Sequence, residues 1–285
     1  LSVSGNLSAG QSTGASNGFA FSGSVGGFGG TGADAGDVTV TSLGNIFVNA
    51  ENNTGSGRTG DSLQAVTFGG NSIGLLAQSI GGGGGSGGVS VSGVVTKAGT
   101  PLSLNVGGYG GAGGDAGSVS VTRGYTIASG VLVATGGLIR VFGSGRADPA
   151  DPAGEAKALE LSGGLIAQSI GGGGGNAGLT ASLAARAGGE NTDSMLGIFT
   201  VGGDGASAGN GSTVTVRHAG DIITDGLNST GILAQSIGGG GGNGSYNLGL
   251  GFSKGSKTAN IGVGGRGGAA GSAGDVAVDH AGAII

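Results

Sequence analysis

One nine-residue phrase occurs three times without change, and it constrains what this chain can fold into. It reads Ala-Gln-Ser-Ile followed by five glycines, and it occupies residues 77–85, 167–175 and 234–242. The 77 glycines among 285 residues do not by themselves produce three identical copies of equal length. Fixed phrases that recur along a chain are typical of repeat architectures, in which each unit packs on its neighbours. The sequence therefore predicts a repetitive fold.

A second recurring phrase divides the chain into modules. It begins with Val-Gly-Gly at residues 25, 106, 201 and 263, which gives spacings of 81, 95 and 62 residues. Both ends of the chain are expected to cut modules of a longer array. The resulting units are the end of a truncated module (1–24), module 1 (25–105), module 2 (106–200, with an insertion at 140–160), module 3 (201–262) and the start of a truncated module (263–285).

The segments around the glycines favour β-strands. Residues 38–40 and 214–216 both read Val-Thr-Val, a period-two pattern that can bury one face of a strand. Residues 73–80 have apolar side chains at both parities, which predicts a strand buried on both faces, with Gln78 bonded to backbone or to stacked neighbours. Short strands between glycine turns predict an all-β fold, a repetitive, parallel β-helix-like solenoid. A coil of about 20 residues is usual, so each module is expected to hold three or four coils, with equivalent glycines several coils apart.

The glycine runs can be read in two ways. Ordering a glycine costs about 0.5–1 kcal/mol relative to alanine, so five in a row need compensation from packing. If ordered, they make either a close backbone approach that only a chain without Cβ atoms permits or extended, left-handed, polyglycine-type threefold helices that hydrogen-bond sideways; if not, they are a flexible linker. Their equal length favours ordered packing, in which case Gly83→Val or Gly173→Val should abolish folding. The structural repeat positions are Gln78, Gly81, Gly83, Gly85, Gln168, Gly171, Gly173, Gly175, Gln235, Gly238, Gly240 and Gly242.

The composition argues against several classes of partner. Charged residues make up 9% of the chain and the formal net charge is −5, with no basic stripe, so no nucleic acid partner is expected. Cysteine is absent, which excludes a disulfide framework and thiolate chemistry. No run of about 18 apolar residues occurs, so the sequence predicts no transmembrane helix.

Two stretches fit the opening of a calcium-binding Gly-Gly-x-Gly-x-Asp repeat. They begin at residues 29 and 110, and they make Asp34, Asp37 and Asp115 weak calcium candidates. The units are isolated rather than tandem, and later modules carry serine at the matching position, which favours plain turn chemistry. Calcium is therefore kept only as a low-ranked cofactor.

No residues carry a catalytic pattern. His218 and His280 stand at the same module position, each before Ala-Gly, and are expected in surface turns. Acid, base and nucleophile do not occur at matched spacing, so we predict no enzyme, no catalytic residue and no cofactor-binding residue. The insertion in module 2 is the most polar segment, and insertions in repeats usually form loops on a binding face. Its candidate contact residues are Arg140, Arg146, Asp148, Asp151 and Glu155.

The phrase from Gly220 to Ile237, with the glycines of 238–242, resembles the passenger repeats of large autotransporter proteins of Gram-negative bacteria. Through the module, the resemblance covers essentially the whole chain. It implies a right-handed parallel β-helix that acts as an adhesin or surface fibre. It also implies display at the cell surface through an outer-membrane β-barrel that is absent from this piece, the only membrane link expected.

The expected function is therefore a non-catalytic, extracellular structural or adhesin segment, a fibre or stalk on the bacterial surface with a host or surface ligand. Two alternatives stay open. One is a self-assembling extracellular filament in which glycines pack between identical chains. The other is a calcium-stabilised binding module.

Overall fold

The fold is all-β. The computed structural model describes residues 3–10, 19–48, 50–51, 64–65, 72–97, 99–142, 162–188, 195–225, 229–254 and 257–285. Every regular element in these ranges is a β-strand, and most strands pair in parallel within several sheets. The described part of the chain contains no helix able to cross a lipid bilayer. The all-β prediction is confirmed.

Five parallel sheets carry the fold, and we name them A to E. Sheet A contains β1 (Val3–Gly10), β8 (Val89–Thr96), β15 (Thr180–Arg186) and β20 (Asn247–Ser253). Sheet B contains β2 (Phe19–Val25), β9 (Thr100–Val106), β16 (Met195–Val201) and β21 (Lys257–Val263). Sheet C contains β3 (Val38–Ser42), β10 (Val119–Arg123), β17 (Val214–Ala219) and β22 (Val276–Ala281).

Sheets D and E have three strands each. Sheet D contains β4 (Ile46–Val48), β13 (Ile139–Phe142) and β18 (Ile222–Asp225). Sheet E contains β7 (Ile73–Ile80), β14 (Ser162–Ile170) and β19 (Ser229–Ile237). Two antiparallel pairs complete the list: β5 (Ala50–Glu51) with β6 (Gln64–Ala65), and β11 (Tyr125–Ala128) with β12 (Val131–Ala134).

Successive modules lie side by side in register. Gln168 is the direct partner of both Gln78 and Gln235 in sheet E, at sequence separations of 90 and 67 residues. In sheet B, Val106 pairs with Val25 and with Val201 in the same way. The expectation of three or four coils per module is therefore wrong. Each module contributes at most one strand to each of the five sheets and so forms a single coil. The coil is long because its glycine stretches are extended segments between distant sheets, whereas a compact coil would connect its strands with short turns.

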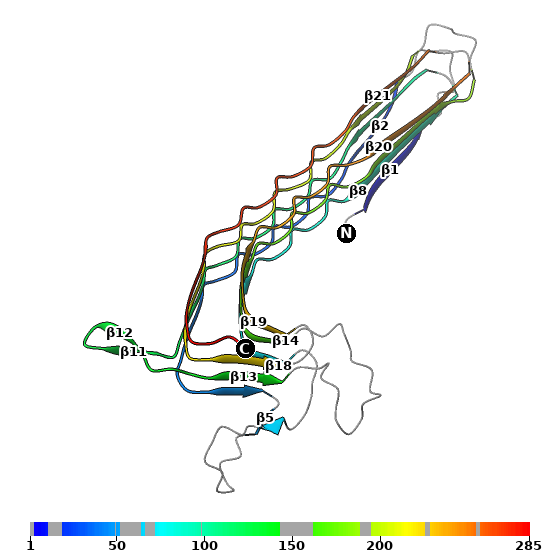
Figure 1. The fold of residues 1–285 in the computed structure, drawn as a ribbon. Coiled ribbons are helices and arrows are strands. Elements are labelled where there is room, and N and C mark those ends of the chain that lie inside the picture. The colour runs from blue at the N-terminus through cyan, green and yellow to red at the C-terminus, as the bar shows by residue number, and fades with distance from the viewer. Residues whose placement is uncertain are drawn as a thin grey trace, which may run out of the picture.

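Two glycine-rich walls connect the sheets. We call residues 26–37, 107–118, 202–213 and 264–275 the first wall, which runs from sheet B to sheet C. Residues 81–88, 171–179 and 238–246 form the second wall, which runs from sheet E to sheet A. Figure 1 shows the result: an elongated molecule with sheets A and B at one end, sheets C, D and E at the other, and the two walls side by side between them.

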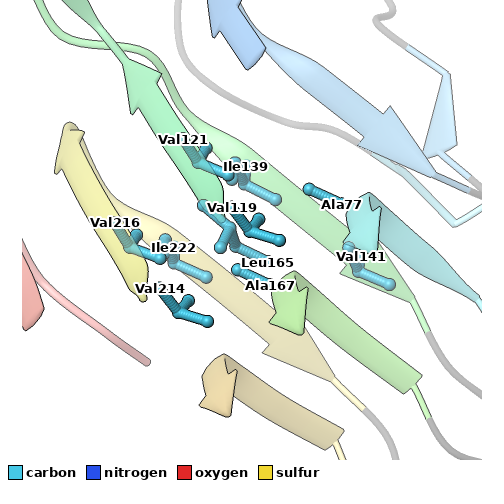
Figure 2. Packing of buried hydrophobic residues seen from close by; sticks show 10 residues of the cluster. All are labelled: Ala77, Val119, Val121, Ile139, Val141, Leu165, Ala167, Val214, Val216 and Ile222. Carbon is cyan, nitrogen blue, oxygen red and sulfur yellow. The ribbon is translucent and has the colours of Figure 1, made fainter. Parts of the chain in front are cut away.

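An apolar core lies where sheets C, D and E meet (Figure 2). Val119 and Val121 of β10 point inward from alternate positions, toward Ile139 of β13 and Leu165 of β14. Each has at most 1% of its surface exposed. Full burial of such side chains stabilises a fold by about 1.5–3 kcal/mol each, so this end of the molecule holds most of the hydrophobic stabilisation.

The interior between sheets A and B is polar next to the walls. Ser92 and Ser103 face each other with their hydroxyl oxygens 2.7 Å apart. The buried amide of Asn105 donates to the carbonyl oxygens of Ser90 and Ala181 at 3.0 and 2.7 Å. Farther from the walls the interior becomes apolar, with a cluster of Val94, Ala184, Leu196 and Ile198. In the Val-Ser alternation at the start of β8, Ser90 and Ser92 are therefore buried, whereas Val91 faces outward and is 43% exposed.

Candidate interaction surfaces

The repeated phrase places each side chain in a distinct environment. Ala77 lies in the apolar core and is 2% exposed. Gln78 points away from the core, and its Nε2 donates to Oε1 of Gln168 at 2.5 Å; Gln168 repeats this bond to Gln235 at 2.7 Å. The prediction that glutamines bond to stacked neighbours is confirmed. The prediction that the strand is buried on both faces is wrong for β7, because Ile80 is 54% exposed.

The serine of the phrase joins sheet E to the first wall. The hydroxyl of Ser79 donates to the carbonyl oxygen of Gly36 at 2.9 Å and accepts from the backbone N–H of Gly117 at 2.8 Å. Ser169 repeats both bonds one module later, to Gly117 and Ser212. A hydroxyl both donates and accepts, so no aliphatic residue of similar size can replace it here.

Backbone hydrogen bonds connect the walls in a continuous zigzag. The N–H of Gly114 in the first wall donates to Gly82 in the second, and the N–H of Gly172 donates back to Gly114, at 2.8 and 2.9 Å. Gly209 then donates to Gly172 at 2.8 Å. Within the second wall, every third N–H instead bonds the next module, as Gly81 does to Ile170 at 2.8 Å. The pentaglycines of the three modules are therefore hydrogen-bonded on two sides.

Steric space, rather than backbone conformation, explains most wall glycines. None of the glycines in the walls has a φ in the positive range that favours glycine. A Cβ on Gly84 would lie 1.8 Å from the carbonyl oxygen of Gly111 in the opposite wall. A Cβ on Gly172 would lie 2.0 Å from the carbonyl oxygen of Gly82 in the neighbouring module. Close backbone approach of this kind is open only to glycine.

Every third wall residue points outward, and there the steric demand disappears. The nearest atom to a Cβ on Gly83 or Gly173 is a carbonyl oxygen at 4.0 or 3.7 Å, an ordinary contact. The prediction that valine at these two positions abolishes folding is therefore wrong, because the middle glycine of each run faces away from both neighbours. The positions that cannot accept a side chain are its neighbours in the run.

The outward residues of the first wall form columns that bond from module to module. Oδ1 of Asp34 accepts the backbone N–H of Asp115 at 2.8 Å, and Oδ1 of Asp115 accepts that of Asn210 at 2.6 Å. Oδ1 of Asp37 accepts both the N–H and the hydroxyl of Ser118, and these bonds lower the pKa of Asp37. The three calcium candidates thus bind backbone of the following module. No group of three or more acidic or histidine residues suited to a metal occurs within the described ranges.

A column of polar side chains, buried in its first two members and half-buried in the third, lies at the end of sheet C. Arg123, His218 and His280 are register partners. Arg123 and His218 have no exposed surface. The imidazole rings stack with centroids 5.2 Å apart and Nδ1 atoms 3.2 Å apart. Burial, followed by the charges of Arg123 and His280, lowers the pKa of His218 to about 4. The expectation of a surface turn is wrong for His218, because it has the inward parity of Val214 and Val216.

Arg123 is bound where the chain passes from sheet C to sheet D. Its guanidinium donates to the carbonyl oxygens of Gly137 and Gly44 at 3.1 and 2.5 Å, and burial lowers its pKa. Arginine supplies five donors in a fixed plane. It therefore joins the connection between sheets C and D in module 2, at Gly137, to the same connection in module 1, at Gly44.

The outer faces of sheets A and B display apolar side chains. Leu248, Leu250 and Phe252 alternate along β20 and are 52%, 45% and 60% exposed. Monomeric proteins rarely expose extended apolar patches without an interaction at that site. Other large apolar side chains that are exposed on strands β2, β8, β9, β15, β16 and β21 are Val91, Val95 and Leu183 in sheet A, and Phe19, Phe21, Val25, Leu104, Met195, Phe199, Val201, Ile261 and Val263 in sheet B.

An apolar hairpin projects from module 2 (Figure 1). Strands β11 and β12 are joined at Ser129 and Gly130, whose φ values are 52° and 78°. Ile127 and Val131 are 76% and 63% exposed. Sequence reasoning missed this element, although Ser-Gly between two β-branched stretches is a hairpin signal.

Of the five predicted contact residues, the structure describes only Arg140. Arg140 lies half-buried in β13, where it pairs with Phe47 and Ile223 of the neighbouring modules. Arg146, Asp148, Asp151 and Glu155 lie outside the described residues. The contact-loop hypothesis therefore stays a prediction.

Comparison with protein-family models, with curated proteins and with solved structures finds no match to this chain.

Proposed function

We propose that this chain is a non-catalytic structural and adhesive segment of the bacterial cell surface, built as a β-solenoid with polyglycine-type walls. The solenoid interpretation is supported by modules that pair in register through five parallel sheets. The polyglycine interpretation is supported by the threefold alternation of wall residues among the opposite wall, the neighbouring module and solvent. A body of this kind gains length with each added module, as a fibre or stalk requires.

The reversed polarity of sheets A and B carries the adhesive part of the proposal. Ser90, Ser92 and Asn105 are buried between the sheets, whereas Leu250 and Phe252 face outward. Burying polar groups and exposing apolar ones forgoes hydrophobic stabilisation of about 25 cal/mol per Å². A surface that contacts a partner recovers that stabilisation on binding. The partner would be a host or surface ligand with apolar surface of its own.

The test is adhesion of beads coated with the 285-residue chain to host epithelial cells under flow. Coated beads should be retained above uncoated ones, and the double variant Leu250→Ser/Phe252→Ser should reduce retention severalfold. Phe28→Ser is the matched control, because Phe28 is a 74% exposed aromatic residue that lies on the first wall and not on sheet A or B. Retention equal to that of uncoated beads would rule out the adhesive role.

A further inference from the structure

The outer face of the second wall presents four columns of side chains, one residue from each module per column. The first is Ile80, Ile170 and Ile237, and the second is Gly83, Gly173 and Gly240. The third is Ser86, Asn176 and Asn243, and the fourth is Val89, Leu179 and Tyr246. Neighbouring columns are three residues apart, about 9 Å in a threefold extended chain.

The two outer columns are apolar and open to solvent. Ile80 and Ile237 are 54% and 42% exposed, and Leu179 and Tyr246 are 47% and 80% exposed. The face carries no charged residue in any of its four columns. The outward columns of the first wall differ, since they hold one arginine and five aspartates: Arg266, Asp34, Asp37, Asp115, Asp204 and Asp275.

The glycine column is unexplained by contacts within the chain. All outward positions of the first wall carry side chains, so glycine is not the default where space is available. On the second wall a Cβ at Gly173 would meet nothing closer than 3.7 Å, and one at Gly240 would meet nothing within 4 Å. Glycine nevertheless costs about 0.5–1 kcal/mol at each site relative to alanine. The described residues also supply no hydrogen-bond acceptor for the N–H groups of Gly173 and Gly240.

The next column shows how such an N–H is satisfied. Oδ1 of Asn176 accepts the N–H of Asn243 from the following module at 2.9 Å. In the first wall, Asp34 and Asp115 do the same for their own columns. The glycine column has no side chain for this task. Gly173 and Gly240 are exposed, so water satisfies these N–H groups in the isolated chain, and a partner that replaces this water must bring an acceptor narrow enough for a hollow one residue wide.

The order of the columns is complementary to its own reverse. Read in one direction it is apolar, hollow, polar and apolar; read in the other it is apolar, polar, hollow and apolar. We propose that a second copy of this chain docks on this face, related by a twofold axis that passes between the glycine and the Ser/Asn columns. Interfaces of this symmetry are self-complementary, with each contact made twice.

The twofold axis fixes which residues meet. Asn176 of each copy enters the hollow at Gly173 of the other, where its amide oxygen, which accepts from Asn243 in its own chain, accepts a second bond from the N–H of Gly173. Ile170 meets Leu179 of the second copy. In the outer modules, Gly83 meets Asn243 and Ile80 meets Tyr246. The absence of charge on this face removes the like-charge repulsion that a chain of net charge −5 would meet elsewhere.

Sedimentation of the full 285-residue chain tests the proposal through Gly173→Leu. This variant fills the hollow and should weaken dimerisation at least tenfold while its melting midpoint stays at or above that of the parent. Ser207→Leu adds the same side chain at an outward position of the first wall and should leave dimerisation unchanged. A chain that stays monomeric at about 100 µM, or a Gly173→Leu variant that dimerises as the parent does, would overturn the proposal.

Cysteine pairing tests the orientation, since the chain has no cysteine of its own. The double variant Gly173→Cys/Asn176→Cys should form a disulfide-linked dimer on mild oxidation, because the twofold axis brings the two positions together. Each single variant should crosslink far less. Equal crosslinking by singles and double would refute the twofold arrangement. None of these readouts depends on adhesion, so this inference and the proposed function can fail separately.

Discussion

Adjacent glycines of one run should respond to alanine with opposite signs. At Gly174 the new Cβ would lie 2.1 Å from the carbonyl oxygen of Ala206 in the first wall. Real Cβ atoms essentially never approach within 3.0 Å, so the walls must separate by at least about 0.9 Å at this point. At Gly173 the nearest atom is 3.7 Å away and nothing needs to move.

The separation breaks the hydrogen bonds that flank Gly174. Ala206 and Gly209 of the first wall donate to the carbonyl oxygens of Gly175 and Gly172 at 3.0 and 2.8 Å, and a further 0.9 Å places both bonds beyond hydrogen-bond range. Two lost bonds cost about 0.5–1.5 kcal/mol each, and the overpacking strain adds about 1–3 kcal/mol. Gly174→Ala should therefore lower the free energy of unfolding by about 2–6 kcal/mol. Gly173→Ala should raise it by about 0.4–1 kcal/mol, because alanine restricts the unfolded chain.

Urea unfolding followed by circular dichroism measures both variants against the parent chain. The expected result is a lower midpoint for Gly174→Ala and an equal or higher one for Gly173→Ala. Gly84 and Gly83 form a second matched pair in module 1, since a Cβ at Gly84 would lie 1.8 Å from backbone. The wall geometry would be refuted if the two members of a pair shifted the midpoint equally, as they would in a flexible linker.

Three further predictions concern side chains of the walls and of the core, and a fourth concerns calcium. The lowered pKa of His218, about 4 against an ordinary 6.5, means that the folded state resists protonation. Stability should therefore be complete above pH 6.5 and fall by about 2 kcal/mol, after allowance for screening, as pH drops through 4; a pH profile unchanged in His218→Gln would contradict this. Gln168→Leu removes two amide bonds and should cost about 1–3 kcal/mol in the same urea assay, whereas an unchanged midpoint would show that the ladder contributes nothing. Asp115→Ala should destabilise the chain by about 1 kcal/mol and Asp115→Asn by less, because Asn retains the oxygen that accepts from Asn210. Calcium or a chelator should leave the midpoint unchanged, and a rise with calcium would restore the metal interpretation.

The sequence predicts the strands and the repeat well because both depend on local patterns. Residues 38–40 alternate with period two, and the three copies of the phrase align as register partners. The size of a coil was mispredicted because it depends on how far a glycine stretch extends. That distance follows from interwall packing and not from turn residues.

The wall positions that point outward, one in every three residues, could have been predicted from the sequence. Phe28, Thr31, Asp34 and Asp37 stand three residues apart in a stretch otherwise composed of glycine and alanine, which marks a period of three. Inside a pure pentaglycine no side chain marks that period, so nothing distinguished Gly83 from its neighbours. Counting in threes from Ile80 to Ser86 would have identified Gly83 as the outward position of the run.

The hydrogen bonds of the walls have a consequence for arrays of any length. Bonds within a wall run from an earlier module to a later one, as from Gly81 to Ile170, whereas the zigzag of bonds between the walls runs back along the chain, from Gly172 to Gly114 and from Gly114 to Gly82. The peptide dipoles of the two sets therefore oppose each other along the stack. An α-helix adds its peptide dipoles head to tail and accumulates charge at its ends. These walls can be extended module by module while their dipoles offset one another.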